Sequence, residues 1–490
     1  MPPRVATLCC LAAIAGLFYL DRDEKARTSP WLWMPVVWIG LGGSRNLSVW
    51  LGGSSLTASP EQYLEGSPLD RAFLTLLVVA AIGVLIARGQ RTAELMKRNW
   101  PLLLFVGYCF ASVMWSDFPF IALKRWTKML GNVSMVLVVL SDPNPSVAVR
   151  KFLTRVAFLL IPASVLMIKY YPELGRIYDR WEGIAYYTGA TTDKNMLGCI
   201  CMVFGFGILM RFLESLSDAA PRRRLIATGL VLAMNLWLFH MAQSATSLGC
   251  FLIGGSLIAV LTLMRRPRPW IVHGMVGGMV TIGVVAYFFQ DAFALLVQSM
   301  GRNTTLTGRT DLWNDVLKID THPMFGAGFE SFFLGDRLEF LWSKYWWHPN
   351  EAHNGYLETY LTLGIVGLSL LGLLLITGYR NIISVYRLDP LSGSLRLAFL
   401  VTTPIYNITE AAFKVTNPMW IMFLLVVTAT PFAAEAIDAA RERKPATAPT
   451  QPVVVKWKMP PAVDRTRPAS NRRSPTPLVR WQTPNRASNP

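Results

Sequence analysis

Charged residues are scarce in this sequence. Only 16% of its 490 residues are Asp, Glu, Lys or Arg, whereas soluble domains carry about 25%. This shortage excludes an ordinary water-soluble fold and favours lipid as the solvent around much of the chain. Cysteine is also rare, and all six cysteines lie inside apolar stretches without the spacing of metal ligands or of a disulfide framework. We therefore expect neither a disulfide scaffold nor a cysteine metal site.

Long apolar runs take the place of the missing charge. The first run, 5–20, resembles a signal peptide, but charged residues follow it without a small-residue cleavage site, so we expect a retained helix. The sequence predicts an all-α polytopic membrane protein with about 12 to 13 transmembrane helices, because spanning helices need roughly 20 apolar residues each. Further apolar runs lie at 72–87, 225–241, 247–264 and 356–379.

The net charge of +17 is concentrated in short connections between apolar runs and in the proline-rich tail. Basic clusters at such places mark the cytoplasmic side of membrane proteins. If the spans alternate in direction, every basic cluster lies on that side of the membrane. No nucleic-acid-binding motif accompanies the positive charge, so we expect no nucleic-acid partner. The span boundaries before residue 71 are less distinct than those that follow. The later predicted spans lie near 71–88, 99–116, 120–140, 150–170, 194–212, 225–242, 246–264, 270–289, 356–378, 395–412 and 417–433.

One predicted outer connection, 290–355, is far longer than a turn. By its length it should carry short helices of its own and hold a site. The segment 309–319 has helical apolar spacing, which predicts an amphipathic helix lying on the membrane surface. Its apolar side would be formed by Leu312, Trp313, Val316 and Leu317. We expect four divisions: an N-terminal transmembrane bundle (1–289), a periplasmic catalytic loop (290–355), C-terminal transmembrane helices (356–433) and a disordered basic cytoplasmic tail (434–490).

Four short motifs follow one another on the predicted outer side. They are Gly308-Arg309-x-x-x-Trp313, His322-Pro323-x-x-Gly326-x-Gly328, His353-Asn354-x-Tyr356-Leu357 and Gly364-x-x-Gly367. Their order resembles the signature of the O-antigen ligase and O-antigen and exopolysaccharide polymerase superfamily, and the clear match covers roughly 240–380. Upstream, Asp193-Lys194-Asn195-x-Leu197-Gly198 and Ser44-Arg45-Asn46-Leu47-Ser48-x-Trp50 resemble elements of the succinoglycan-type polymerase branch.

The resemblance implies a GT-C-like membrane glycosyltransferase in the bacterial inner membrane, with its active site facing the periplasm. Its donor would be a glycan on a polyprenyl diphosphate such as undecaprenyl diphosphate, and its acceptor a sugar hydroxyl. Exopolysaccharide or O-antigen polymerisation is the preferred activity. Alternatives are ligation to lipid A core in lipopolysaccharide biosynthesis, transfer to protein, an inactive scaffold, or a transporter or flippase. A chain-length regulator and a flippase are expected partners.

The motif residues suggest chemical roles in such a transfer. Arg309 would bind the leaving diphosphate, because the planar guanidinium pairs bidentately with phosphate oxygens. A neutral imidazole of His353, with an ordinary pKa of about 6.5, would accept the proton of the acceptor hydroxyl. We expect the carboxylates of Asp311 and Glu330 to bind substrate, and Asp311, Glu330, Glu351 and Glu358 are alternative bases. The other predicted substrate-binding residues are Lys194, Asn195, Asn354, Arg176 and Arg180.

Other polar residues favour structural interpretations. A zinc site at His348 and His353 is disfavoured, because their spacing of five differs from the zincin pattern and Pro349 opposes a helix there. We expect no metal and no cofactor. Glu410 and Lys414, four residues apart, predict a structural ion pair at the end of a span. The polar turn 243–247 suits either sugar and phosphate contacts or a helix cap.

Overall fold

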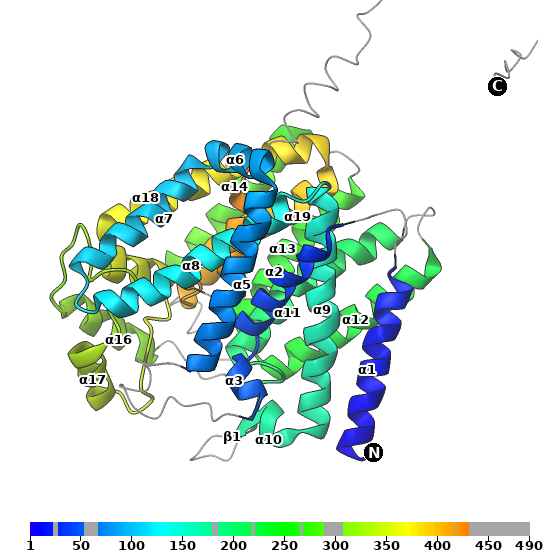
Figure 1. Ribbon diagram of the computed structural model, residues 1–490, viewed down its shortest axis with the longest axis horizontal. Coiled ribbons are helices and arrows are strands. Elements are labelled where there is room, and N and C mark those ends of the chain that lie inside the picture. The colour runs from blue at the N-terminus through cyan, green and yellow to red at the C-terminus, as the bar shows by residue number, and fades with distance from the viewer. Residues whose placement is uncertain are drawn as a thin grey trace, which may run out of the picture. The chain divides into compact units, whose positions relative to one another are not determined.

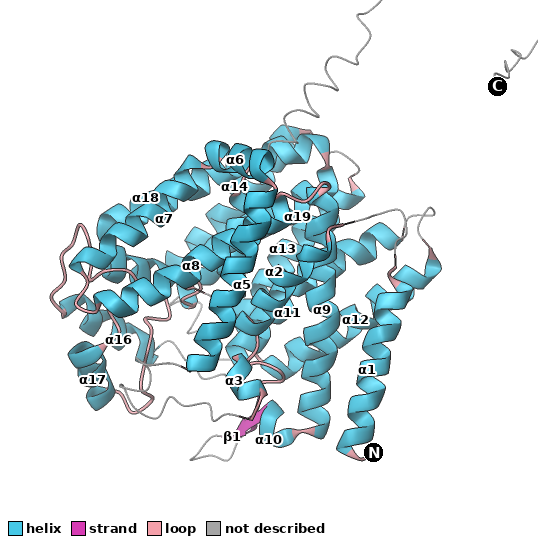
Figure 2. Ribbon diagram, in the orientation of Figure 1, coloured by secondary structure: helices cyan, strands magenta, loops and turns pink. Residues whose placement is uncertain are grey.

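The computed structural model describes residues 1–22, 28–52, 67–178, 185–216, 221–264, 268–288, 307–415 and 417–430. The chain divides into two units, Met1–Ala439 and Ala440–Pro490, and the second unit lies outside the described residues, as does the whole predicted tail. Helices dominate the described part of the first unit, and the two short strands form one antiparallel pair (Figures 1 and 2).

The elements follow one another in this order along the chain. They are α1 (Pro3–Leu20), the 3-10 helix η1 (Pro30–Leu32), α2 (Trp33–Gly42), α3 (Leu47–Trp50), α5 (Pro68–Ala87), α6 (Gly89–Arg98), α7 (Trp100–Ala111), the 3-10 helix η2 (Ser112–Trp115), α8 (Pro119–Leu140), α9 (Pro145–Tyr170), α10 (Pro172–Gly175), β1 (Arg176–Tyr178), β2 (Ala185–Tyr187), α11 (Lys194–Ser215), α12 (Arg222–Ala242), α13 (Ala245–Leu263), α14 (Pro269–Phe288), α16 (Thr307–Lys318), α17 (Gly335–Lys344), α18 (Gly355–Leu388), α19 (Pro390–Thr409) and α20 (Pro418–Val427).

The predicted all-α polytopic class is confirmed. Within the described ranges, seven helices are long and apolar enough to cross a membrane: α1, α5, α9, α11, α12, α13 and α18. Four shorter apolar stretches accompany them, in α2, α7, α14 and α20. The remaining predicted spans coincide with α8 and α19, which are more polar because they carry basic residues such as Lys128 and Arg396.

Polar residues at the helix starts explain where many of these helices begin. The side chains of Asp193, Asn354, Asp389 and Asn417 accept hydrogen bonds from the first backbone N–H groups of α11, α18, α19 and α20. Such caps satisfy donors that have no partner inside the helix. Proline in the first turn of α8, α9, α19 and α20 costs no internal hydrogen bond there. The sequence thus marks the helix starts locally.

Contacts between basic helix ends support the alternating arrangement. Arg88, which follows α5, donates a hydrogen bond of 2.8 Å to the hydroxyl of Ser141 after α8. Arg150, in the first turns of α9, lies 3.9 Å from the carboxylate of Asp389 after α18. These pairs bring the ends of α5, α8, α9 and α18 together, as helices that cross back and forth require.

The long connection has a hydrophobic core of its own. Leu312 and Val316 of α16 are fully buried and pack in one cluster with Phe332 and with Leu338 of α17. The predicted helix is therefore present, but the predicted surface position is wrong for its apolar side, which packs against protein. Leu317 is 55% exposed and does not join that side. Residues 290–306 lie outside the described ranges.

The two glycine motifs interlock. α18 is interrupted at Gly364, whose φ is +65°, and the segment 323–327 fills the interruption with backbone hydrogen bonds. Ile365 donates to the carbonyl of Pro323, and Ala327 donates to that of Leu361. A Cβ at Gly364 would lie 2.3 Å from the Met324 backbone. Glycine is needed here because the left-handed conformation and the close backbone approach both exclude a side chain.

Candidate active site

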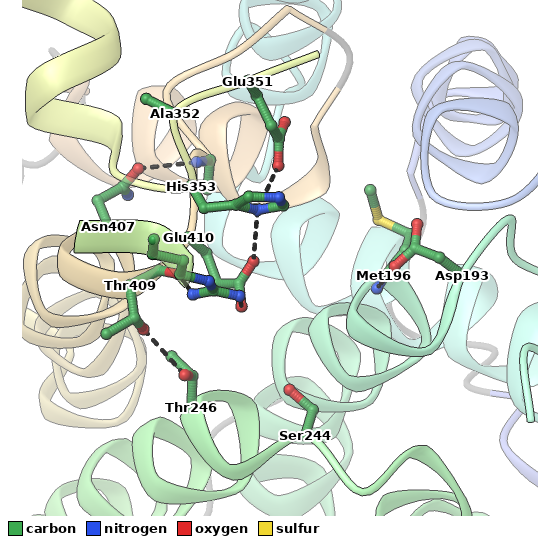
Figure 3. A network of polar contacts seen from close by, with 12 residues as sticks. Asp193, Met196, Ser244, Thr246, Glu351, Ala352, His353, Asn407, Thr409 and Glu410 are labelled. Atoms are coloured by element: carbon green, nitrogen blue, oxygen red, sulfur yellow. Dashed lines mark hydrogen bonds and ion pairs between the residues drawn. The ribbon is translucent and has the colours of Figure 1, made fainter. Parts of the chain in front are cut away.

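Arg309 and His353, the two predicted catalytic residues, meet at one carboxylate. Nη2 of Arg309 lies 3.5 Å from Oε1 of Glu410. Nδ1 of His353 lies 3.9 Å from Oε2 of the same side chain, and Figure 3 shows the ring between Glu351 and Glu410. Arg309 also donates to the carbonyl of Thr409, the last residue of α19. α16, the start of α18 and the end of α19 therefore each contribute one charged group to the same point.

A second carboxylate and a lysine extend this group. Nδ1 of His353 lies 3.0 Å from Oε1 of Glu351, whose other oxygen lies 2.9 Å from Nζ of Lys414. Lys414 also lies 3.3 Å from Glu358, in the first turn of α18. We call Arg309, Glu351, His353, Glu410 and Lys414 the charged cluster. Its members alternate in sign, so each cation has a carboxylate partner.

The backbone around His353 is held in a demanding conformation. The φ of His353 is +50°, which costs free energy for a residue with a side chain. Asn354 caps α18, and Gly355 donates a backbone hydrogen bond to the carbonyl of Glu410. A Cβ on Gly355 would lie 2.0 Å from Oδ1 of Asn407. The His-Asn-Gly sequence thus fixes the imidazole against the end of α19.

The electrostatic surroundings change the protonation of His353. Partial burial lowers the pKa of its ring, but the carboxylates of Glu351 and Glu410 outweigh this and raise the pKa to about 9. Burial also raises the pKa of Glu351, yet Lys414 and His353 lower it well below its usual range. At neutral pH the ring is therefore an imidazolium beside an ionised Glu351. This contradicts the predicted neutral imidazole with an ordinary pKa.

The polar turn between α12 and α13 belongs to the same place. The hydroxyl of Thr246 is hydrogen bonded to that of Thr409 at 2.9 Å, next to the carbonyl that Arg309 contacts. Ser244 donates to Ser247 at 3.0 Å. At the start of α11, burial and the nearby charge of Glu351 both raise the pKa of Asp193. Figure 3 shows Asp193 and Met196 on this neighbouring helix, set apart from the charges. The hydroxyls of the polar turn thus lie beside the charged cluster.

Some predicted binding residues have structural partners. The guanidinium of Arg176 donates to the carbonyl of Ile168 at the end of α9, and Asn354 is committed to its cap. The carboxylate of Glu330 accepts a hydrogen bond of 2.8 Å from the backbone of Val415. These contacts are within the protein, and the binding roles of the three residues stay predictions.

The other predicted binding residues lie on α11 and α16 or outside the described ranges. Nζ of Lys194 lies 4.3 Å from the ring centroid of Tyr186, and Asn195 follows it in the first turn of α11. Asp311 is exposed on α16, where its charge acts on Tyr345. Arg180 lies outside the described residues.

Glu410 and Lys414 are the residues that sequence reasoning misassigned. The helical pair predicted between them does not form as expected, because α19 ends at Thr409 and 410–415 are not helical. Glu410 pairs with Arg309 and His353 instead, and Lys414 pairs with Glu351 and Glu358. The available signal was the rarity of ionisable residues at the end of an apolar run, which marks function as often as structure.

The charged cluster has ligand atoms at the spacing of a metal site, but its charges oppose a metal ion. Ligand atoms of Glu351, His353 and Glu410 lie within 4.8 Å of one another. The carboxylates, however, already pair with Lys414 and Arg309, and His353 is protonated, so a cation would have to displace three positive charges. The arrangement therefore disfavours a metal ion at these three ligand atoms.

Comparison with known proteins adds independent evidence. The O-antigen ligase family matches residues 230–372, a range that contains Arg309 and His353 and both glycine motifs. The exopolysaccharide production protein ExoQ of Rhizobium meliloti (strain 1021) is 23% identical over 290 residues, which make up 57% of this chain and 64% of that protein. The chain thus spans less than two thirds of that relative's length. Both comparisons confirm the resemblance predicted from the motifs, and this chain is similar to the O-antigen ligase and polymerase superfamily of membrane glycosyltransferases.

Proposed function

We propose that this protein transfers a glycan from a polyprenyl-diphosphate-linked donor to a sugar hydroxyl at the periplasmic face of the bacterial inner membrane. The observation that carries the proposal is the convergence of Arg309 and protonated His353 on Glu410. Two cations at one point match the charge that develops on a departing diphosphate. Donors of this kind are the lipid-linked glycans that the superfamily resemblance implies.

The transfer needs one bond to form and one to break at the anomeric carbon. The acceptor oxygen forms a bond to that carbon while its proton passes to a carboxylate, and the bond between carbon and diphosphate oxygen breaks. Arg309 and imidazolium His353 stabilise the leaving diphosphate, which departs with the electron pair. Because His353 already holds a proton and the pKa of Glu351 is held well below its usual range, Glu410 takes the role of base that the sequence assigned to the imidazole. We propose no metal ion for this step.

The choice of acceptor rests on two features. The Lys194-Asn195 element at the start of α11 resembles polymerases, and the relative ExoQ is named as an exopolysaccharide production protein. Both favour polymerisation of repeat units. The family description, O-antigen ligase, favours ligation to lipid A core as the second candidate. Gel analysis of surface polysaccharide from a deletion strain separates them, since the first leaves polymer missing and the second leaves bare lipid A core.

An Arg309→Lys variant tests the proposal. It keeps the positive charge but loses the planar fork, so we expect the rate of glycan transfer to fall by about 100-fold, the cost of removing one donor to a developing anion. Arg337→Lys is the matched control, because Arg337 pairs with Asp117 away from the cluster. Transfer is measured with purified protein and a lipid-diphosphate donor. Equal rates in both variants would refute a bidentate role for Arg309.

A further inference from the structure

A polar cavity lies along α18, far from the charged cluster. Its volume is about 270 Å³, and α7, α18 and α20 form its walls. α18 begins beside His353 but lines the cavity only from Leu374 to Ser384, and α20 reaches it only at Val427, its last residue. The cavity is therefore at the opposite end of these helices and is separate from the candidate active site.

Side-chain amides hold the walls of the cavity together. Oδ1 of Asn99 accepts a hydrogen bond of 2.7 Å from the backbone of Ala429, and its Nδ2 donates to the carbonyl of the same residue. Nδ2 of Asn381 donates to the carbonyl of Val427 at 3.0 Å. These bonds connect the start of α7 and the end of α18 to the end of α20, so the hollow is a fixed part of the fold.

The charge of the cavity selects an anion. Arg98 and Arg380 both line it, and both are exposed. No aspartate or glutamate is among its lining residues, and in the part of the chain that the structure describes neither guanidinium has an acidic partner. Serine, threonine and asparagine side chains also line the cavity, together with apolar residues such as Leu102 and Leu374. The two guanidinium groups are the donors that pair with phosphate oxygens.

The surroundings of the cavity point to a lipid as the source of the phosphate. Trp100, at the cavity, is 57% exposed, and tryptophan is enriched at the boundary between lipid and water. One helical turn deeper, Leu104 of α7 is 48% exposed and Ile376 of α18 is 64% exposed. An acyl chain could lie on these apolar side chains while its headgroup fills the cavity.

We propose that this cavity binds the phosphate headgroup of an anionic phospholipid of the surrounding bilayer. The two arginines pair with the phosphate, and Leu104 and Ile376 contact the acyl chains. The proposal does not depend on the glycan-transfer activity, because none of these residues belongs to the charged cluster.

Native mass spectrometry of the purified full-length protein tests this proposal. Phosphatidylglycerol and phosphatidylcholine are titrated separately into the detergent solution. We expect an Arg98→Gln, Arg380→Gln double variant to bind phosphatidylglycerol about tenfold more weakly than the wild type, since each arginine near anionic lipid contributes severalfold in affinity. A Lys97→Gln, Arg387→Gln double variant removes the same charge from exposed residues outside the cavity and should bind normally.

Four results would overturn the proposal. Equal weakening in both double variants would mean that charge alone attracts the lipid, and equal binding of phosphatidylcholine would mean that the cavity does not select anions. Displacement of phosphatidylglycerol by millimolar inorganic phosphate would identify a site for a free anion instead. The thermal unfolding temperatures of both double variants are compared, and a loss of binding that accompanies a fall in this temperature only in the cavity variant counts against the proposal.

Discussion

At the scale of single residues, the charge on His353 makes a prediction about pH. The carboxylates that surround its ring outweigh burial and raise its pKa to about 9, so the imidazolium is present at neutral pH and is lost as pH rises through that value. If the charged ring stabilises the leaving diphosphate, the transfer rate should be steady near neutral pH, fall to half at a pH of about 9 and decline further above it. Initial rates of the purified protein across this range provide the measurement.

Substitution of His353 separates the two roles considered for it. A neutral base would give a rate that increases with pH through the same pKa, which is the opposite of the expected profile. His353→Gln should lower the rate and abolish the alkaline decline. His348→Gln is the control, because the ring of His348 stacks on Trp342 outside the charged cluster. A wild-type profile in His353→Gln would show that another group titrates.

The sequence predicted the identity of the central residues but not their partners. Arg309 and His353 stand in recognisable motifs, and the structure brings them together. Glu410 lies 57 positions beyond His353 in the sequence, and nothing in the local pattern indicates that α19 ends against α18. The ordinary pKa assigned to His353 failed for the same reason, since the carboxylates that shift it become neighbours only through packing.

At the scale of helices, two glycine substitutions in α18 measure how much the interruption at Gly364 contributes to stability. Gly364→Ala introduces a Cβ at a φ of +65° and within 2.3 Å of the Met324 backbone, so we expect a loss of at least about 2 kcal/mol in the free energy of unfolding. Gly372→Ala places its Cβ in open space and should be neutral or stabilising by up to about 1 kcal/mol, because alanine favours helix. Thermal unfolding in detergent measures both.

Equal unfolding temperatures for the two alanine variants would mean that the interlock of 323–327 with α18 contributes little to stability.

The interlock of 323–327 with α18 also could not be predicted from the sequence. Apolar periodicity and caps predict the helix positions, but the pattern through Gly364 continues without a break and predicts one straight span. Likewise, the apolar side of α16 is evident in the sequence, whereas its burial against Phe332 depends on a distant segment.

At the scale of the whole molecule, the side of the membrane that the charged cluster faces decides which donor it can reach. The polyprenyl-linked donor of the proposed reaction is present on the periplasmic side, whereas the basic ends of α6, α9 and α18 favour the cytoplasm. Figure 1 shows that α6 and α17 lie at opposite ends of the helical bundle of the first unit. The proposal therefore requires α17 outside and α6 inside.

Single cysteines at exposed positions can measure this orientation. Ser343→Cys on α17 and Gln90→Cys on α6 both place the thiol at an exposed site, in a background without the native cysteines. A maleimide that cannot cross the inner membrane should label Ser343→Cys in intact spheroplasts and Gln90→Cys only after lysis. Labelling of Gln90→Cys alone in intact spheroplasts would put the cluster in the cytosol. Nucleotide sugars would then become the donors within its reach, because they are made in the cytosol, and the lipid-diphosphate role of Arg309 would lose its basis.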